Sequence, residues 1–168
     1  MNTEDTQSRE WLTTHVAVLK KVTRAFAEPA DQPDLMQELL LAVWKAAPAF
    51  RGDSAPSTFV YKIALNRALT WRKRESTRRH RDIKASAQWV IATTDGSKES
   101  DAMMLEHLYA AIRQLPAFDR ALVLLSLEGL PYRDIARLHG LSESNTGARL
   151  TRIRQKLSSI IEADRHES

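Results

Sequence analysis

The side chains best suited to chemistry in this sequence are basic and polar groups near its C-terminal end. Arg149, Thr151, Arg152, Gln155 and Lys156 fall on the outer side of one amphipathic helical pattern. A helix that docks by its apolar face and carries basic groups opposite is suited to the major groove of DNA. We therefore expect DNA binding here. A helical hairpin with a solvated basic face and no DNA partner is the alternative that this segment alone leaves open.

A helix-turn-helix over residues 130–157 is expected to position these groups. Pro131 suits the first turn of a helix, because a missing N–H costs little there. Gly140 is placed to end that helix in a left-handed conformation, and Ser142 is a good N-cap for the next helix. Side chains that should face the core then recur at helical spacing: Thr146, Leu150, Ile153, Leu157 and Ile160.

Composition narrows the possible classes of protein. The chain has 168 residues, of which 43% are hydrophobic and 27% charged, as in ordinary globular proteins. It has no cysteine, and its five histidines lack ligand-like spacing, so we expect no disulfide, metal site or cofactor. No apolar run could cross a bilayer, and residues 1–10 lack a signal-peptide core. A cytoplasmic protein without membrane insertion is expected.

The positive charge of the chain is concentrated in one segment. Residues 61–84 contain nine basic and two acidic side chains, a net charge of +7, whereas the whole chain carries +4. Such a block favours polyanions, of which nucleic acid phosphates are the simplest case. A basic linker or a solvated helix end is the alternative.

The apolar periodicity is helical nearly throughout, and its breaks divide the chain. Residues 86–99 lose the periodicity and are typical of a flexible tether. The predicted fold class is therefore all-α, with two small helical domains at residues 1–84 and 101–168 and a linker at 85–100. Before the helix-turn-helix, helices are expected at 10–26, 34–47, from 58 into the basic segment, 101–115 and 117–127.

Two helices of the first domain carry faces that burial alone does not explain. The helix at 34–47 has a broad apolar side, and opposite it a strip of Asp34, Gln37, Glu38, Leu41 and Lys45. That strip is equally compatible with ordinary surface and with docking of a partner helix. On the next helix, aromatic residues alternate with lysine, asparagine and arginine, which suits nucleic acid. Without the basic segment that follows, core packing would be the favoured role of Tyr61 and Trp71.

Taken together, these segments resemble a bacterial RNA polymerase sigma factor of the extracytoplasmic-function (ECF) group. Residues 34–41 (DLMQELLL) resemble the polymerase-binding helix of the group. Residues 50–55 (FRGDSA) and 58–67 (TFVYKIALNR) resemble its −10 promoter-reading loop and helix. Leu115-Pro and residues 132–157 resemble its −35-reading domain. The resemblance spans nearly the whole chain and keeps the order of the motifs.

The resemblance implies partners and site residues. Core RNA polymerase, through its β′ clamp helices and β flap, and promoter DNA are the implied partners, with control by an anti-sigma factor. The loop at 51–57 would hold a base flipped from the non-template strand. Polymerase binding is implied for Asp34, Leu35, Gln37 and Glu38. Contacts to −10 DNA are implied for Arg51, Asp53, Ser54, Phe59, Lys62, Asn66, Arg67, Arg72, Lys73 and Arg74. Contacts to −35 DNA are implied for Arg149, Thr151, Arg152 and Lys156.

Two residues depart from the pattern of the group. Phe59 stands where the group usually has tryptophan. Gly147 stands on the recognition helix where a longer, often basic residue is common. We expect Gly147 to weaken that helix by about 1 kcal/mol relative to alanine. It would also remove one base contact, or let the backbone approach DNA closely.

Two other functions compete with transcription initiation. A stand-alone helix-turn-helix regulator would bind a symmetric duplex site without polymerase, with its N-terminal domain serving dimerisation or sensing. An enzyme using Asp and Glu side chains would need a paired acid–base constellation, and the sequence shows none. We therefore expect a protein that is not an enzyme.

Overall fold

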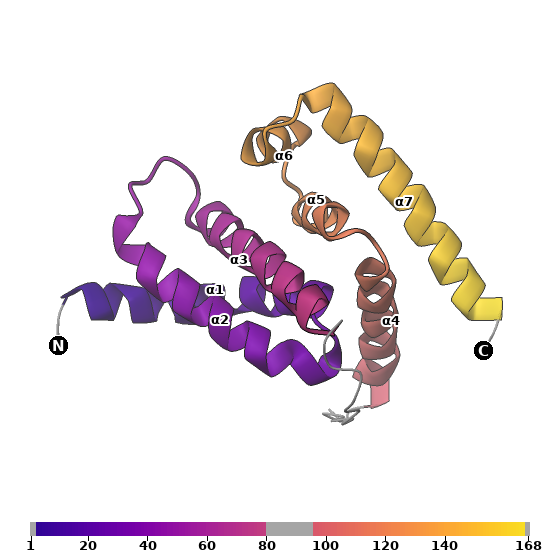
Figure 1. The fold of residues 1–168 in the computed structure, drawn as a ribbon, viewed down its shortest axis with the longest axis horizontal. Coiled ribbons are helices and arrows are strands. Elements are labelled where there is room, and N and C mark those ends of the chain that lie inside the picture. Colours follow the sequence, from indigo (N-terminus) through magenta and orange to yellow (C-terminus); the bar gives the residue numbers. More distant parts are fainter. Residues whose placement is uncertain (1–2, 80–95, 167–168) are drawn as a thin grey trace. The chain divides into compact units, whose positions relative to one another are not determined.

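A computed structural model of the chain describes residues 3–79 and 96–166 (Figure 1). All regular structure in these residues is helical, which confirms the predicted all-α class. Contacts divide the chain into two compact units, residues 1–89 and 90–168. Most of the predicted linker, residues 85–95, lies outside the described residues. Its last five residues, 96–100, are helical.

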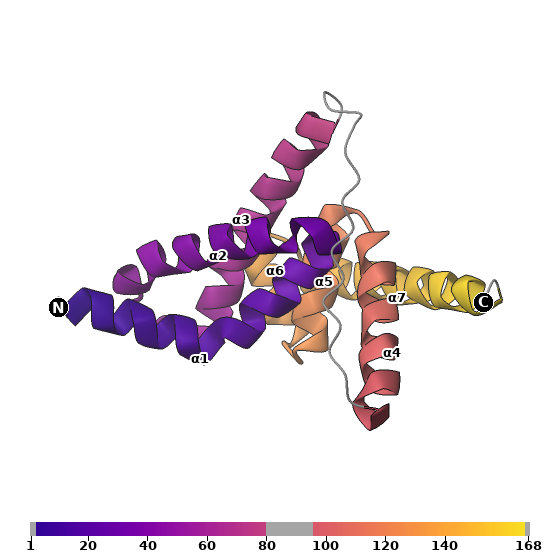
Figure 2. The same ribbon diagram turned by 90° about the horizontal axis from the view of Figure 1, so that it is seen from below.

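The first unit is a bundle of three helices, α1 (Thr3–Phe26), α2 (Gln32–Ala46) and α3 (Pro56–Arg79). Each helix packs on the other two, as Figure 2 shows from below. Short 3₁₀ turns at Pro29–Asp31 and Ala47–Ala49 follow α1 and α2, where prolines interrupt the helical pattern. The core is formed mainly by Leu19, Val22, Phe26, Leu35, Leu39, Val43, Val60, Tyr61, Ala64, Leu65, Ala68 and Trp71. Core packing of Tyr61 and Trp71 is thereby confirmed.

The second unit comprises α4 (Gly96–Arg113), α5 (Ala117–Leu127), α6 (Tyr132–His139) and α7 (Glu143–His166). Helix α4 begins five residues before its predicted start at Asp101. Apolar periodicity could not reveal this start, because residues 96–100 (GSKES) contain no large apolar side chain. An amphipathic pattern marks only the part of a helix that packs on the core, so it does not show where an exposed end of the helix begins.

A buried arginine fixes the turn between α4 and α5. Arg120 is 4% exposed, and its Nε donates a hydrogen bond of 2.8 Å to the carbonyl of Leu115. Its Nη2 also contacts the carbonyl of Arg113. The guanidinium thus satisfies carbonyls at the C-terminal end of α4 that the helix itself leaves without partners.

The helix-turn-helix forms as predicted, with small shifts at its start. Gly140 adopts a left-handed φ of 66°, and the N–H of Leu141 donates to the carbonyl of Ala136 at 2.9 Å. The Ser142 hydroxyl caps α7 by accepting a 3.1 Å bond from the N–H of Asn145. Pro131 precedes α6 rather than lying within its first turn. The predicted core positions of α7 are buried except Ile160, which is half-buried: Thr146, Leu150, Ile153 and Leu157.

Candidate nucleic-acid interface

The outer face of α7 is an exposed polar surface on the second unit. Thr151, Arg152 and Lys156 are exposed, in agreement with their predicted placement away from the core. The Thr151 hydroxyl donates to the carbonyl of Gly147 at 3.0 Å, so its oxygen remains available as an acceptor. Gln155 is exposed there as predicted, and the same face exposes further positions that sequence reasoning did not name: Ser144, Asn145 and Ala148.

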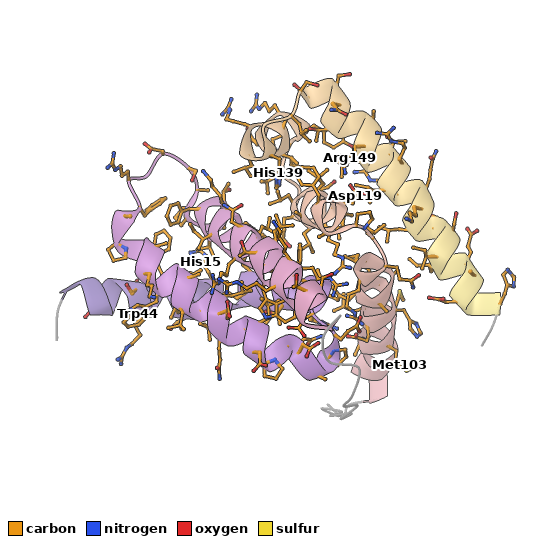
Figure 3. The ribbon with its side chains drawn as sticks, viewed as in Figure 1. His15, Trp44, Met103, Asp119, His139 and Arg149 are labelled. Atoms are coloured by element: carbon orange, nitrogen blue, oxygen red, sulfur yellow. The ribbon has the colours of Figure 1, made fainter. Side chains whose placement is uncertain are left out.

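Arg149 lies on one flank of this face and is already paired. Its Nε contacts Oδ1 of Asp119 on α5 at 2.6 Å, and its guanidinium carbon lies 4.8 Å from the centroid of the Phe118 ring. Figure 3 shows Asp119 and Arg149 close together. The Arg149 side chain is only 36% exposed. Arg149 therefore links α7 to α5, and only its remaining N–H groups are left for another acceptor.

The opposite flank of α7 is held by a second arginine that sequence reasoning missed. Arg154 donates hydrogen bonds to the Tyr132 hydroxyl at 2.8 Å and to the Ser126 hydroxyl at 2.9 Å. Its guanidinium carbon also lies 5.9 Å from the centroid of the Tyr132 ring. These contacts join residues 22 and 28 positions apart in the chain, so no local pattern reveals them.

Gly147 packs against a ring of the neighbouring helix α6, a contact that the sequence did not predict. A Cβ built on Gly147 would lie 3.3 Å from Cδ2 and 3.4 Å from Cε2 of the Tyr132 ring. The residue thus faces α6, and its missing side chain makes room for the ring. The structure thus gives Gly147 a packing role, while its expected effects on contact with DNA stay predictions.

Replacing Gly147 with alanine should stabilise the second unit by less than helix propensity alone predicts. Alanine gains about 1 kcal/mol over glycine in a helix, but here its methyl group meets the Tyr132 ring at less than ordinary contact distance. In a Tyr132→Ala background the same substitution should give the full gain. Urea unfolding of the four proteins measures this difference, and equal gains in both backgrounds would contradict the packing role.

His139 should make the stability of the second unit dependent on pH. The ring lies at the C-terminal end of α6, edge-on to Phe118 at 5.2 Å, and its Nε2 is buried without a hydrogen-bond partner in the described residues. Burial lowers the pKa of His139 below its usual 6.5. As pH falls through 6.5 the unfolded chain binds a proton before the folded one does, so the free energy of unfolding decreases.

A His139→Gln variant should therefore lose less stability than the natural chain between neutral and mildly acidic pH. Glutamine retains a polar side chain of similar size but does not titrate in this range. Thermal unfolding of both proteins at several pH values, followed by circular dichroism, measures the difference. Parallel losses of Tm in the two proteins would show that another group titrates.

Helix α3 presents the basic face of the first unit. Lys62, Asn66, Lys73 and Arg74 are exposed, and Arg72 is half-buried. Arg67 instead forms an ion pair through Nη2 with Oε2 of Glu38 on α2, and their side chains are 34% and 31% exposed. One ion pair thus joins a residue expected to bind DNA to a residue expected to bind polymerase.

The loop before α3 is fully exposed. Arg51, Asp53 and Ser54 all project into solvent, and Gly52 adopts a left-handed φ of 81°. The Ser54 hydroxyl makes a 3.4 Å hydrogen bond to the carbonyl of the adjacent Ala55. Because α3 begins at Pro56 rather than at the expected residue 58, the loop expected at 51–57 ends at Ala55.

Phe59 does not project freely from α3. Its ring packs edge-to-face with Trp11 of α1, at a centroid distance of 5.8 Å, and with Phe50, at 5.2 Å. The side chain is half-buried, so the structure gives it a packing role in the free protein. Trp11 was missed in the sequence because it lies far from the loop along the chain.

The four residues of α2 expected to bind polymerase do not all face solvent. Asp34 and Gln37 are exposed and Glu38 is half-buried, so these three form a strip on one side of the helix. Leu35, by contrast, has 0% exposure. A direct contact between Leu35 and a partner is therefore wrong for this structure, since its side chain packs inside the bundle. Leu41 is 59% exposed and extends the strip.

Residues 3–79 and 96–166 show neither a metal-binding cluster nor a membrane-spanning helix. No group of three or more acidic or histidine side chains there is arranged to hold a metal ion. None of the helices in the same residues has the length and hydrophobicity needed to cross a bilayer.

Comparison with known proteins identifies both units. The family model for Sigma-70 region 2 matches residues 11–78, and that for Sigma-70, region 4 matches residues 105–157. The ECF RNA polymerase sigma-E factor of Escherichia coli (strain K12) is 28% identical over 147 residues, covering 82% of this chain and 77% of the relative. The factor of the same name from Haemophilus influenzae is 29% identical over 142 residues, covering 79% and 75%.

Two solved structures share the helical fold. RpoE from Bartonella quintana, in complex with the anti-sigma factor NepR, gives a TM-score of 0.70 at 18% identity and covers 93% of this chain and 96% of that one. CnrH, in complex with the cytosolic domain of CnrY, gives 0.59 at 21% identity and covers 94% and 88%. Because regions 2 and 4 match the two helical units in order, the chain belongs to the ECF group of the sigma-70 family, whose members direct core RNA polymerase to promoter DNA.

Proposed function

We propose that this sigma factor divides promoter recognition between its two units, α3 and its preceding loop holding melted −10 DNA and α7 reading the −35 duplex. The observation that carries the proposal is that each unit presents exposed basic side chains along one helix. Neutralising phosphates with such side chains releases counterions and drives binding without regard to sequence. Exposed polar groups on the same faces then supply contacts to bases.

Most of the proposed contacts are assigned to exposed side chains, and the half-buried Glu38, Arg67, Arg72 and Arg149 lie beside them. On α2, Asp34, Gln37 and Glu38 would bind the β′ clamp helices, with Leu35 supporting the helix from inside, while the second unit would meet the β flap. The loop would accept a flipped base, whose extrusion costs a few kcal/mol that pocket and phosphate contacts can offset. Contacts to −10 DNA are assigned to Arg51, Asp53, Ser54, Lys62, Asn66, Arg67, Arg72, Lys73 and Arg74. Contacts to −35 DNA are assigned to Thr151, Arg152 and Lys156, with Arg149 at their edge.

The proposed layout of domains follows the same division. Residues 1–84 would form the unit that binds polymerase and the −10 element, and residues 101–168 the unit that binds the −35 element. Residues 85–100 would join them, although the last five of these already belong to α4. A tether of this kind would let polymerase set the spacing between the two DNA-binding units.

Transcription in vitro tests the proposal directly. Purified protein and core RNA polymerase would be incubated with templates that carry randomised promoter sequences, and the transcribed templates sequenced. We expect transcripts that require the protein and templates that share a −35 and a −10 sequence. The stand-alone regulator predicts the reverse, namely a footprint by the free protein on a symmetric duplex and no transcripts that depend on it.

We further propose that an anti-sigma protein controls this factor. Both solved structures of similar fold are complexes in which a sigma factor or related protein is bound by a second polypeptide, NepR in one and CnrY in the other. Affinity purification from the native cell should recover a partner that blocks transcription in the assay above. Full activity of the factor in extracts of unstressed cells would argue against such control.

We also propose that the protein contributes binding and no catalysis, and that it acts in the cytoplasm. Polymerase supplies the chemistry of RNA synthesis, and the groups on α2, α3 and α7 suit recognition of charged surfaces. Free protein incubated with nucleoside triphosphates and template should therefore give no product until core polymerase is added.

A further inference from the structure

An aromatic cluster brings α1 into contact with both ends of the loop. The Trp11 ring centroid lies 4.7 Å from that of Phe50 and 5.8 Å from that of Phe59, and the two phenylalanines are 5.2 Å apart. The His15 ring centroid lies 5.6 Å from that of Trp11. All these ring pairs are edge-to-face, the arrangement that aromatic quadrupoles favour, and all four side chains are half-buried.

This cluster is the main anchor of the loop. Phe50 immediately precedes residues 51–55, and Phe59 lies in the first turn of α3 just beyond them. Within the described residues, no side chain of 51–55 forms an ion pair or hydrogen bond to α1 or α2, and the Ser54 hydroxyl bonds only to the neighbouring Ala55. Packing of Trp11 against the two phenylalanines therefore fixes where the loop starts and where it ends.

We propose that Trp11 is a positioning residue for base capture, holding the loop at 51–55 in the geometry that receives an unpaired base. The inference rests on the proposed role of this loop at the −10 element. In it Trp11 acts through Phe50 and Phe59 and does not itself touch DNA. A loop whose ends are held in place loses less conformational entropy on binding, and its affinity for the base rises accordingly. Removing the indole should therefore weaken capture of melted DNA while leaving other surfaces intact.

The test compares two DNA probes with the reconstituted holoenzyme. One probe is a fork junction with a single-stranded non-template −10 element, and the other is a duplex that carries the −35 element and ends upstream of −10. Trp11→Ala should weaken binding of the fork probe several-fold, and by no more than the roughly 150-fold that complete loss of one stacked base would cost. Binding of the duplex probe and of core polymerase should not change, and Trp11→Phe should restore most of the fork affinity.

Trp44→Ala serves as the matched control, because Trp44 is a half-buried tryptophan on α2 of the same unit (Figure 3). It should leave the preference between the two probes unchanged. If Trp11→Ala proves unfolded by circular dichroism, Trp11→Leu keeps apolar bulk without the ring and carries the same expectation. Equal weakening of both probes, or none, would overturn the positioning role. Failure of the unaltered holoenzyme to bind the fork probe would instead defeat the −10 assignment itself, and this inference with it.

Discussion

Glu38→Lys should remove most of the affinity of the protein for core RNA polymerase. Glu38 lies on the strip of α2 proposed to meet the β′ clamp, and its carboxylate is paired with Arg67. The substitution replaces an acceptor of basic groups by a cation and places that cation beside Arg67. Losing one partner of a close interfacial charge pair costs about 2–5 kcal/mol, which corresponds to a factor of about 30 to 5000 in Kd. Titration of labelled protein with core enzyme measures this loss.

Two variants separate a contact with polymerase from damage within the unit. Glu10→Lys makes the same charge change at an exposed position of α1 and should leave core binding as it is. Arg67→Ala breaks the internal ion pair but keeps the Glu38 carboxylate, so it should retain core binding. If Arg67→Ala weakened core binding as much as Glu38→Lys, Glu38 would act by holding α2 on α3.

Arg152→Ala should relax recognition at one base pair of the −35 element. The Arg152 side chain is exposed on the outer face of α7, and it has no ion pair or hydrogen bond within the described residues. A bidentate contact from such an arginine to guanine discriminates by about 1–3 kcal/mol, or about 5- to 150-fold in affinity. Binding of the variant holoenzyme to a library of −35 sequences, read by sequencing, should show lower affinity and a lost preference at a single position.

Lys156→Ala is the matched control on the same helix. It should weaken all −35 sequences to a similar extent and reduce the salt dependence of binding by about one counterion, as loss of a phosphate contact does. Arg149→Ala is the informative third variant because Arg149 is paired with Asp119. If Arg149→Ala instead lost the preference at a single base pair, and Arg152→Ala weakened all −35 sequences alike, Arg149 rather than Arg152 would be the arginine that reads a base.

Local rules explain the parts of this molecule that the sequence predicts well. The left-handed Gly140, the Ser142 cap and the buried Thr146–Leu150 spacing depend on residues only a few positions apart. Helical periodicity likewise predicted the buried side of α2, with Leu41 left outside. The turns and the amphipathic faces follow from short-range geometry, and the order of the motifs adds the two-unit plan.

The remaining features depend on contacts between distant residues. Arg149 meets Asp119 across 30 positions in the chain, and only the packing of α7 on α5 brings them together. Gly147 was expected to leave a gap among the base contacts, and only the folded structure shows that it packs against Tyr132. Leu35 belongs both to the polymerase-binding motif and to the apolar face of α2. Its 0% exposure assigns it to the core. Spacing along a helix predicts which side a residue occupies, but not which neighbour it meets there.

The two arginines on the flanks of α7 have a consequence for redesign. Arg149 and Arg154 attach the helix to α5 and α6, whereas Ala148, Thr151 and Arg152 lie between them on the free side. Of the residues that orient the helix, only Arg149 also borders the surface proposed to meet DNA. New −35 preferences can be sought by exchanging the outer residues of α7 together while Arg149 and Arg154 are kept. All variants in such a library would share one scaffold.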